Sequence, residues 1–270
     1  MEMIEALRAD AAKVLAEGRA KLVLGYQARG EHRAPAFVSD PAKTTALIYD
    51  DACKQNLAAY LRKPEVRSRG PVAVVAPPAV MRSLVMLAAE TQLADGQVVV
   101  LAVGDGEYHG AKTIAETAAL LKEKFADMAP DPDLLKRIEE LSGMTAEERA
   151  AFWTAEFAKC TRCYACRAAC PGCYCNCCIV EKNVPQWIST AARAHGNYAW
   201  NMIRAFHLAG RCTQCGACEA ACPQGIPLML LNLTISEEIA KQFGEKAGYD
   251  PAAKPVIGSW KPNDNEDFIR

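Results

Sequence analysis

Two short cysteine-rich segments carry the residues whose type and spacing could do chemistry in this chain. The first reads Cys-Thr-Arg-Cys-Tyr-Ala-Cys-Arg-Ala-Ala-Cys-Pro over residues 160–171, and the second reads Cys-Thr-Gln-Cys-Gly-Ala-Cys-Glu-Ala-Ala-Cys-Pro over residues 212–223. Thiolates are the donors that soft metal ions and iron–sulfur clusters select. The repeated string therefore indicates two metal centres.

Both strings follow the spacing C-x2-C-x2-C-x3-C-P, which holds 4Fe–4S clusters and sends the fourth cysteine of each run to the other cluster. Two-residue gaps let the backbone curl so that three thiolates reach three corners of one cube, and the cysteine before the proline begins a new direction. This rule predicts a first cluster bound by Cys160, Cys163, Cys166 and Cys222. It predicts a second cluster bound by Cys212, Cys215, Cys218 and Cys170.

Disulfides and zinc are the simpler uses of so many cysteines. Disulfides persist in oxidising compartments, and the first residues, Met-Glu-Met-Ile-Glu-Ala-Leu-Arg, have neither the basic start nor the apolar core of an export signal. Zinc ribbons use two separated C-x2-C pairs rather than four closely spaced cysteines. We therefore expect iron–sulfur centres in a reducing cytoplasm.

Four more cysteines follow the first string at once, and they allow a third 4Fe–4S cluster. Its ligands would be Cys173, Cys175 and Cys178, with Cys53 or Cys177 as the fourth. Because C-x-C-x2-C is not the ferredoxin spacing, the alternative is that these are small thiols packed beside the clusters. Cys177 and Cys178 followed by the Cys212-x2-Cys215 pair also form a pattern similar to the double-cysteine modules of heterodisulfide reductases.

Composition excludes several other classes of protein. The 270 residues are 51% hydrophobic and 23% charged, as in a globular protein with a real core, and the net charge of −1 points to neither nucleic acid nor an anionic membrane surface. No apolar run approaches the ~20 residues of a membrane span. Residues 151–230 hold seven basic and three acidic side chains. Two clusters of about −2 each, thiolates included, would cancel that excess; the alternative is a basic docking face.

The first 130 residues predict an α/β domain. Apolar positions at helical spacing indicate a helix over 2–18, and β-rich runs indicate strands at 21–26, 45–49, 72–76 and 98–103. Helical patterns alternate with them at 52–61, 79–93 and 112–126. This alternation predicts a mainly parallel sheet, and the prolines at 130 and 132 mark its boundary.

The remaining residues predict helices around the cysteine strings. Thr145 and Glu148 form a capping box that opens a helix leading to Cys160, and further helices are expected over 185–208 and 227–243. The fold class is therefore α+β, with three parts. We expect an N-terminal scaffold or docking domain over 1–130, an α-helical ferredoxin-type domain over 131–248 and an extended C-terminal arm over 249–270.

Signals for a second activity are weak. The Gly104-Asp105-Gly106 turn follows a strand where α/β sheets bind ligands, but it lacks a third glycine. Asp50 and Asp51 could bind a ribose, although capping of the next helix is the favoured role. The histidines show no metal-ligand spacing.

The segments 155–171, 181–188 and 208–218 resemble the iron–sulfur beta subunits of formate dehydrogenases, in the family of deazaflavin-coenzyme-reducing hydrogenase and dehydrogenase beta subunits. The resemblance extends to residues 53–61 and 261–270. It implies an electron-transfer subunit in a cytoplasmic complex of anaerobic metabolism. Partners would be redox subunits of formate dehydrogenase, hydrogenase or heterodisulfide-reductase-like type.

One departure from this family bears on its flavin. The family's Lys-Gly-Cys-Asp-type turn is replaced here by residues 76–82, which keep only Arg82, and its Pro-Cys pair is replaced by 103–106. Both changes argue against FAD and deazaflavin binding. We expect a non-catalytic relay with two or three 4Fe–4S clusters. The alternatives are a flavin-containing oxidoreductase subunit that reduces a soluble coenzyme at the α/β domain, or an assembly protein with structural clusters.

Overall fold

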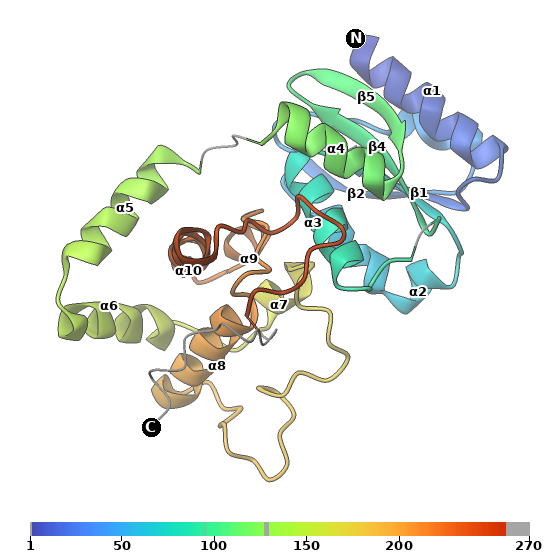
Figure 1. The fold of residues 1–270 in the computed structure, drawn as a ribbon. Helices are drawn as coiled ribbons and strands as arrows, with labels where there is room; N and C mark the ends of the chain where they lie inside the picture. The colour runs from blue at the N-terminus through green and yellow to red at the C-terminus, as the bar shows by residue number, and fades with distance from the viewer. Residues whose placement is uncertain (1, 95, 127–129, 258–270) are drawn as a thin grey trace.

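A twisted sheet forms the centre of the N-terminal half (Figure 1). The structure, a computed structural model, describes residues 2–94, 96–126 and 130–257. Within these residues the sheet has five strands in the order β2-β1-β3-β4-β5. The strands are β1 (Leu22–Arg29), β2 (His32–Val38), β3 (Val72–Ala76), β4 (Val98–Gly104) and β5 (Glu107–Lys112).

The inner strands are parallel and the outer strands are not. β1, β3 and β4 pair in parallel, and every residue of β3 and β4 is buried, as expected for strands covered on both faces. β2 and β5 pair antiparallel at the two edges. The helices of this half are α1 (Glu2–Ala16), η1 (Pro41–Ala46), η2 (Leu57–Arg62), α2 (Pro64–Arg67), α3 (Pro78–Ala89) and α4 (Ile114–Lys124).

The second half is helical, with a long irregular segment between α7 and α8 (Figure 1). Trp153, Phe157 and Leu230 are among the buried residues of its core. The capping box at Thr145 is confirmed, because its side chain accepts from Glu148 N and the Glu148 carboxylate accepts from Thr145 N. The helices are α5 (Pro132–Gly143), α6 (Ala146–Ala158), α7 (Ala165–Ala169), α8 (Ala194–His207), α9 (Ala217–Ala220) and α10 (Leu228–Phe243).

Four expectations about single elements were wrong. The helix expected over 52–61 is only the 3-10 helix η2 over Leu57–Arg62, which begins after Asn56. Residues 45–49 form no strand: Pro41–Ala46 is a 3-10 helix capped by Asp40, and Ile48 makes one isolated bridge to Tyr26. The sheet is mixed rather than mainly parallel, because the polar edge strands β2 and β5 pair antiparallel. Neither of these strands was foreseen. Helix α8 begins at Ala194 rather than at 185, since the Asn183 carboxamide accepts from the Trp187 and Ile188 N–H groups and closes a local turn there.

The mixed α+β class is confirmed, whereas the division into domains stays a prediction. One buried apolar cluster holds residues between 7 and 125, and two others hold residues between 141 and 231. The acidic stretch 264–267 and the segment 261–270 lie outside the described residues. No described helix is both long and apolar enough to cross a membrane.

The chain after α10 returns to the N-terminal half and lies on α3 and α4. Arg82 Nη2 donates to Ala247 O at 3.0 Å, and its guanidinium lies 4.8 Å from the centre of the Tyr249 ring. The Tyr249 hydroxyl donates to Phe125 O at 3.1 Å. Arg211 forms an ion pair with Glu90 of α3. The two halves are therefore joined along α3.

Gly248 is the tightest point of this junction. A Cβ placed there would lie 2.5 Å from Arg82 O, whereas a Cβ at Gly244 would meet nothing within 4 Å. Both glycines have positive φ, so both alanine substitutions carry the backbone cost of about 1–2 kcal/mol. We expect Gly248→Ala to lose about 1–3 kcal/mol more than Gly244→Ala because it also displaces the segment from α3. Denaturant unfolding of both variants measures the difference, and equal losses would contradict this contact.

Candidate functional site

The two cysteine strings adopt the same unusual backbone. In the first loop Arg162 has φ 58° and Tyr164 has φ 60°; in the second, Gln214 has φ 58° and Gly216 has φ 71°. Three of the five described non-glycine residues with positive φ therefore lie at matching positions of the two loops. Side chains disfavour this left-handed region by about 1–2 kcal/mol each, so the rest of the structure must hold the loops in this shape.

Each loop then enters a short helix that carries its third cysteine. α7 holds Cys166 and α9 holds Cys218. Within the first loop Arg162 N donates to Cys160 Sγ at 3.4 Å. The curl brings backbone N–H groups toward sulfur, and such hydrogen bonds stabilise a thiolate.

Cys170 of the first string lies with the cysteines of the second. Burial, followed by the nearby charge of Cys170, raises the pKa of Cys212 to about 12 and also raises the pKa of Cys215. Burial raises the pKa of Cys218 to about 12 as well, with Cys170 among the further causes. Cys170 thus acts electrostatically on all three cysteines of the second string, and their binding of one cluster stays a prediction.

Cys222 of the second string correspondingly lies with the cysteines of the first. Burial raises the pKa of Cys166, and Cys160 and Cys222 raise it further through their charge. These three cysteines also pack against the same apolar cluster of the helical half. Cys163, the remaining member of the predicted set, is exposed.

Among the described residues, no three His, Cys, Asp or Glu side chains are arranged to hold one ion. A zinc ion would bring every sulfur within about 2.3 Å of one point. All thirteen cysteines lie in the described part of the chain, and none forms a disulfide.

The cysteines of the predicted third site are spread out. Cys173 is hydrogen-bonded to Cys170, which raises the pKa of Cys173 and lowers that of Cys170. Cys178 packs beside Val180 and Trp200, and Cys175 and Cys177 are exposed. Cys53 lies in the core of the N-terminal half, where burial raises its pKa to about 11 and its Sγ lies 3.6 Å from Asp50 Oδ1.

Several buried polar side chains around the cysteines were missed by the sequence analysis. Asn56 Nδ2 donates to Ser83 Oγ at 2.8 Å, and Ser83 Oγ lies 2.9 Å from Thr213 Oγ1. The contact between Ser83 and Thr213 connects the N-terminal half to the second loop beside Cys215. Asn232 Nδ2 donates to Cys218 Sγ at 3.6 Å. For Ser83 and Asn232 the only signal in the sequence was a polar residue within an otherwise apolar helical pattern.

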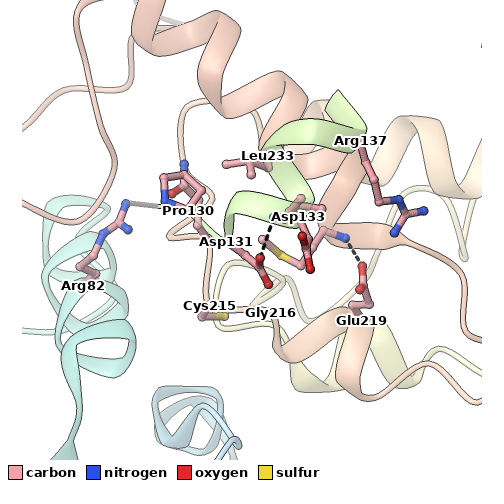
Figure 2. A pocket seen from close by; sticks show the side chains of 12 residues that line it. Arg82, Pro130, Asp131, Asp133, Arg137, Cys215, Gly216, Glu219 and Leu233 are labelled. Carbon is pink, nitrogen blue, oxygen red and sulfur yellow. Dashed lines mark hydrogen bonds between the residues drawn. The ribbon is translucent and has the colours of Figure 1, made fainter. Parts of the chain in front are cut away.

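A pocket of about 410 Å³ opens beside the second loop (Figure 2). Gln214, Cys215 and Gly216 form one side of it, and charged residues of both signs form the others. In Figure 2 the carboxylate of Asp131 accepts from Asp133 N, and that of Glu219 accepts from Met229 N. The second loop therefore borders open space as well as protein.

A second pocket, of about 540 Å³, lies between η2 and the two short helices. Ala168 and Ala169 of α7 and the alanines of α9 give it an apolar wall, while Tyr60 and Lys63 face it from the N-terminal half. Its volume is within the range of small-molecule sites. The equivalent Ala-Ala pairs of the two strings thus lie on one surface.

The structure gives separate outcomes for the two weaker ligand signals, the Gly104-Asp105-Gly106 turn and Asp50. Gly104-Asp105-Gly106 is the turn between antiparallel β4 and β5, so it opens no helix that could face a phosphate. Asp50 accepts from Ala52 N at 3.0 Å and from Arg33 Nε at 2.7 Å. The Arg33 hydrogen bond is the main reason that the pKa of Asp50 is lowered. Asp50 therefore closes a local turn, and the favoured capping role was wrong because the next helix, η2, is capped by Asn56.

The fold and the site define an α+β protein with two ferredoxin-type cysteine loops in a helical half. The chain resembles the beta subunits of formate dehydrogenases that depend on F420. It is 32% identical to the F420-dependent formate dehydrogenase subunit beta of Methanocaldococcus jannaschii over 106 residues, which cover 39% of this chain and 27% of that protein. It is 28% identical to the F420-dependent formate dehydrogenase 1 subunit beta of Methanococcus maripaludis over 135 residues, which cover 49% of this chain and 34% of that protein.

These matches span about a third or less of the length of the curated relatives. No protein-family model matches the chain. The expected resemblance is thereby confirmed for part of the chain, while the activity and partners of the relatives belong to those longer proteins.

The left-handed position at Gly216 gives a direct test of the loop conformation. A Cβ there would meet nothing within 4 Å, so Gly216→Ala changes only the backbone preference. We expect it to cost about 1 kcal/mol and to lower the thermal midpoint by about 2–4 °C. The control is Gly143→Ala at the end of α5, where a Cβ is also unobstructed and φ is not positive. Equal midpoints for the two variants would contradict the shared loop shape.

Proposed function

We propose that this chain is an electron-transfer subunit of a cytoplasmic oxidoreductase complex of anaerobic metabolism, and that it relays single electrons between partner subunits. Two 4Fe–4S clusters would supply the one-electron chemistry. One would be held by Cys160, Cys163, Cys166 and Cys222, and the other by Cys212, Cys215, Cys218 and Cys170. The partners would be other redox subunits, of formate dehydrogenase, hydrogenase or heterodisulfide-reductase-like type.

The observation that carries this proposal is the matching left-handed backbone of the two cysteine loops, at Arg162 and Tyr164 in the first and at Gln214 and Gly216 in the second. Cys170 interacts with the three cysteines of the second string, and Cys222 interacts with Cys166 of the first. This exchange of the fourth cysteines is the ligand pattern of two-cluster ferredoxins. Donor type fits as well, because each group consists of four thiols: Cys218 is buried, Cys163 is exposed and the other six are partly buried.

The chain's own residues hold the donors and limit the access of water. Tyr164 meets Trp200 edge-to-face with ring centres 4.9 Å apart, and Trp200 is almost fully buried beside Cys160 and Cys166. The Asn232 amide supports Cys218 from α10. Low solvent access and hydrogen bonds to sulfur are the protein features that set the potential of such centres.

A third cluster at Cys173, Cys175 and Cys178, with Cys53 or Cys177, stays a separate prediction. Cys173 already interacts with Cys170. The iron content decides between the two stoichiometries. After strictly anaerobic purification, about eight irons and eight sulfides per chain support two clusters, and about twelve of each support three.

Single ligand substitutions test the assignment of the two clusters. We expect Cys163→Ser or Cys215→Ser to lose the four irons of one cluster and to stop electron flow through the complex, while the partner's own half-reaction continues. The matched control is Thr161→Ser, a conservative change at an exposed position of the first string that removes no thiol. Iron measured per chain, with activity of each partner alone, gives the result. An unchanged iron content in both ligand variants would overturn the assignment.

A second candidate function is favoured by the alanine-walled pocket. A flavin-containing oxidoreductase subunit would need an apolar space next to the clusters, and this pocket touches both α7 and α9. The relatives' names add that they depend on F420, a soluble coenzyme. A yellow flavin released on denaturation, in amounts equal to the chain, would support this candidate. If protein with its full complement of iron releases no flavin, the electron relay is the function that remains.

A further inference from the structure

The residues on either side of the first cysteine of the second string contact helix α3 of the N-terminal half. Arg211 precedes Cys212, and its guanidinium donates to both carboxylate oxygens of Glu90, with Nη2 2.7 Å from Oε2. Thr213 follows Cys212, and its Oγ1 lies 2.9 Å from Ser83 Oγ. Ser83 and Glu90 are seven positions apart, about two helical turns, so they lie on one face of α3. Helix α3 therefore contacts the chain on both sides of Cys212.

The Ser83 hydroxyl belongs to a buried hydrogen-bond network. It donates to Ala79 O at 2.9 Å and accepts from Asn56 Nδ2 at 2.8 Å. A hydroxyl has one hydrogen and two acceptor sites, so the Thr213 hydroxyl donates to Ser83. The exposed fractions of Ser83, Asn56 and Thr213 are only 0%, 5% and 5%, and water therefore competes little for these bonds. The network fixes the position of Thr213 relative to α3.

The contact between Arg211 and Glu90 adds a charged bond beside this neutral one. Nε and Nη2 of the guanidinium donate in parallel to the two carboxylate oxygens, an arrangement that is stronger and more directional than a neutral hydrogen bond. The Glu90 side chain is only 10% exposed, so solvent screens the pair weakly. The start of the second loop is thus held from α3 by two independent contacts.

The equivalent positions of the first string are held differently. Lys159, the counterpart of Arg211, pairs with Glu156 at 2.7 Å, one turn earlier in its own helix. Thr161, the counterpart of Thr213, is exposed. The two strings thus share their cysteine spacing but differ at the residues beside the first cysteine.

The first loop is instead held by α8, within the helical half. Asn197 Nδ2 donates to Cys160 O at 2.7 Å, and Arg204 Nη2 donates to Cys166 O at 3.2 Å. Both side chains are buried, with exposed fractions of 1% and 4%. The two loops therefore begin at contacts with different helices, one from each half of the protein.

We propose that Ser83 and Glu90 are positioning residues for the second cluster, and that retention of this cluster, but not of the first, depends on α3. The inference rests on the proposed two-cluster function. Both contacts act on the segment that carries Cys212 and leave the metal untouched. A loop that opens locally exposes its iron to competing ligands, so contacts that keep the loop closed slow the loss of iron.

The test is iron release to a chelator from the iron-loaded full chain, purified anaerobically. Under the proposed function Cys163→Ser retains only the second cluster and Cys215→Ser retains only the first, so each cluster is followed separately. Thr213→Val removes the hydroxyl with little change in shape, whereas Thr213→Ser keeps it. Thr161→Val is the matched control at the equivalent, exposed position of the first string.

The two contacts should have effects of different size on the second cluster. We expect Thr213→Val to release its iron about fivefold faster, because one neutral hydrogen bond is lost. Glu90→Gln removes the charge of a bidentate pair and should release it at least about tenfold faster. Release from the first cluster should stay within about twofold in both variants, since the sites are independent. Thr213→Ser and the controls Thr161→Val and Glu156→Gln should release iron from the second cluster at the unmodified rate.

Each outcome decides the role of α3. Unchanged release from the second cluster in Thr213→Val and Glu90→Gln overturns the proposal. Faster release from both clusters assigns these contacts a general role in stability and also overturns it. A Thr213→Val chain that binds the first cluster but never the second supports it, provided that Thr213→Ser binds both.

The iron content before release separates this proposal from the proposed function. If Cys163→Ser and Cys215→Ser each keep all of their iron, rather than losing about four irons, the two-cluster assignment itself is overturned. If each loses about four irons and the release rates of the Thr213 and Glu90 variants are unchanged, only the role of α3 is overturned.

Discussion

The burial of sulfur donors is the constraint on which the rest of this structure depends. A thiolate inside a protein is an anion removed from water, and it is tolerated only beside hydrogen-bond donors or positive charge. The two cysteine loops meet this requirement with left-handed turns that bring backbone N–H groups near sulfur. Side chains on α8 and α10 supply further donors from outside the loops. The helical half is thus organised around its cysteines more than around its apolar core.

The N-terminal half contributes to the same environment. Asn56 and Ser83 reach Thr213 and the second loop, and α3 carries the glutamate that holds Arg211. The sheet places α3 there because its parallel inner strands are covered by helices on their faces. The N-terminal half has no dinucleotide fingerprint, but it still has a structural role. It forms one wall of the second loop.

Local patterns predicted the parts of the fold that local chemistry determines. The apolar runs at 72–76 and 98–103 became inner strands, and Thr145 with Glu148 opened α6 as a capping box. The edge strands β2 and β5 were not foreseen, because their sequences His-Arg-Ala-Pro-Ala-Phe-Val and Glu-Tyr-His-Gly-Ala-Lys lack an alternating apolar pattern. Arg204 was counted only among the seven basic side chains of residues 151–230. Its burial depends on loops that meet in three dimensions, so its own segment carries no such signal.

The hydrogen bonds from Arg82 to Ala247 join residues 165 positions apart in the sequence. Contacts of such long range carry a loop-closure entropy that must be overcome before they stabilise the fold, and this slows folding. During synthesis, at about 5–20 residues per second, both cysteine strings emerge before the segment that lies across α3. The order of the chain thus leaves this junction open while the thiols are already present, until Ala247 and Tyr249 close it.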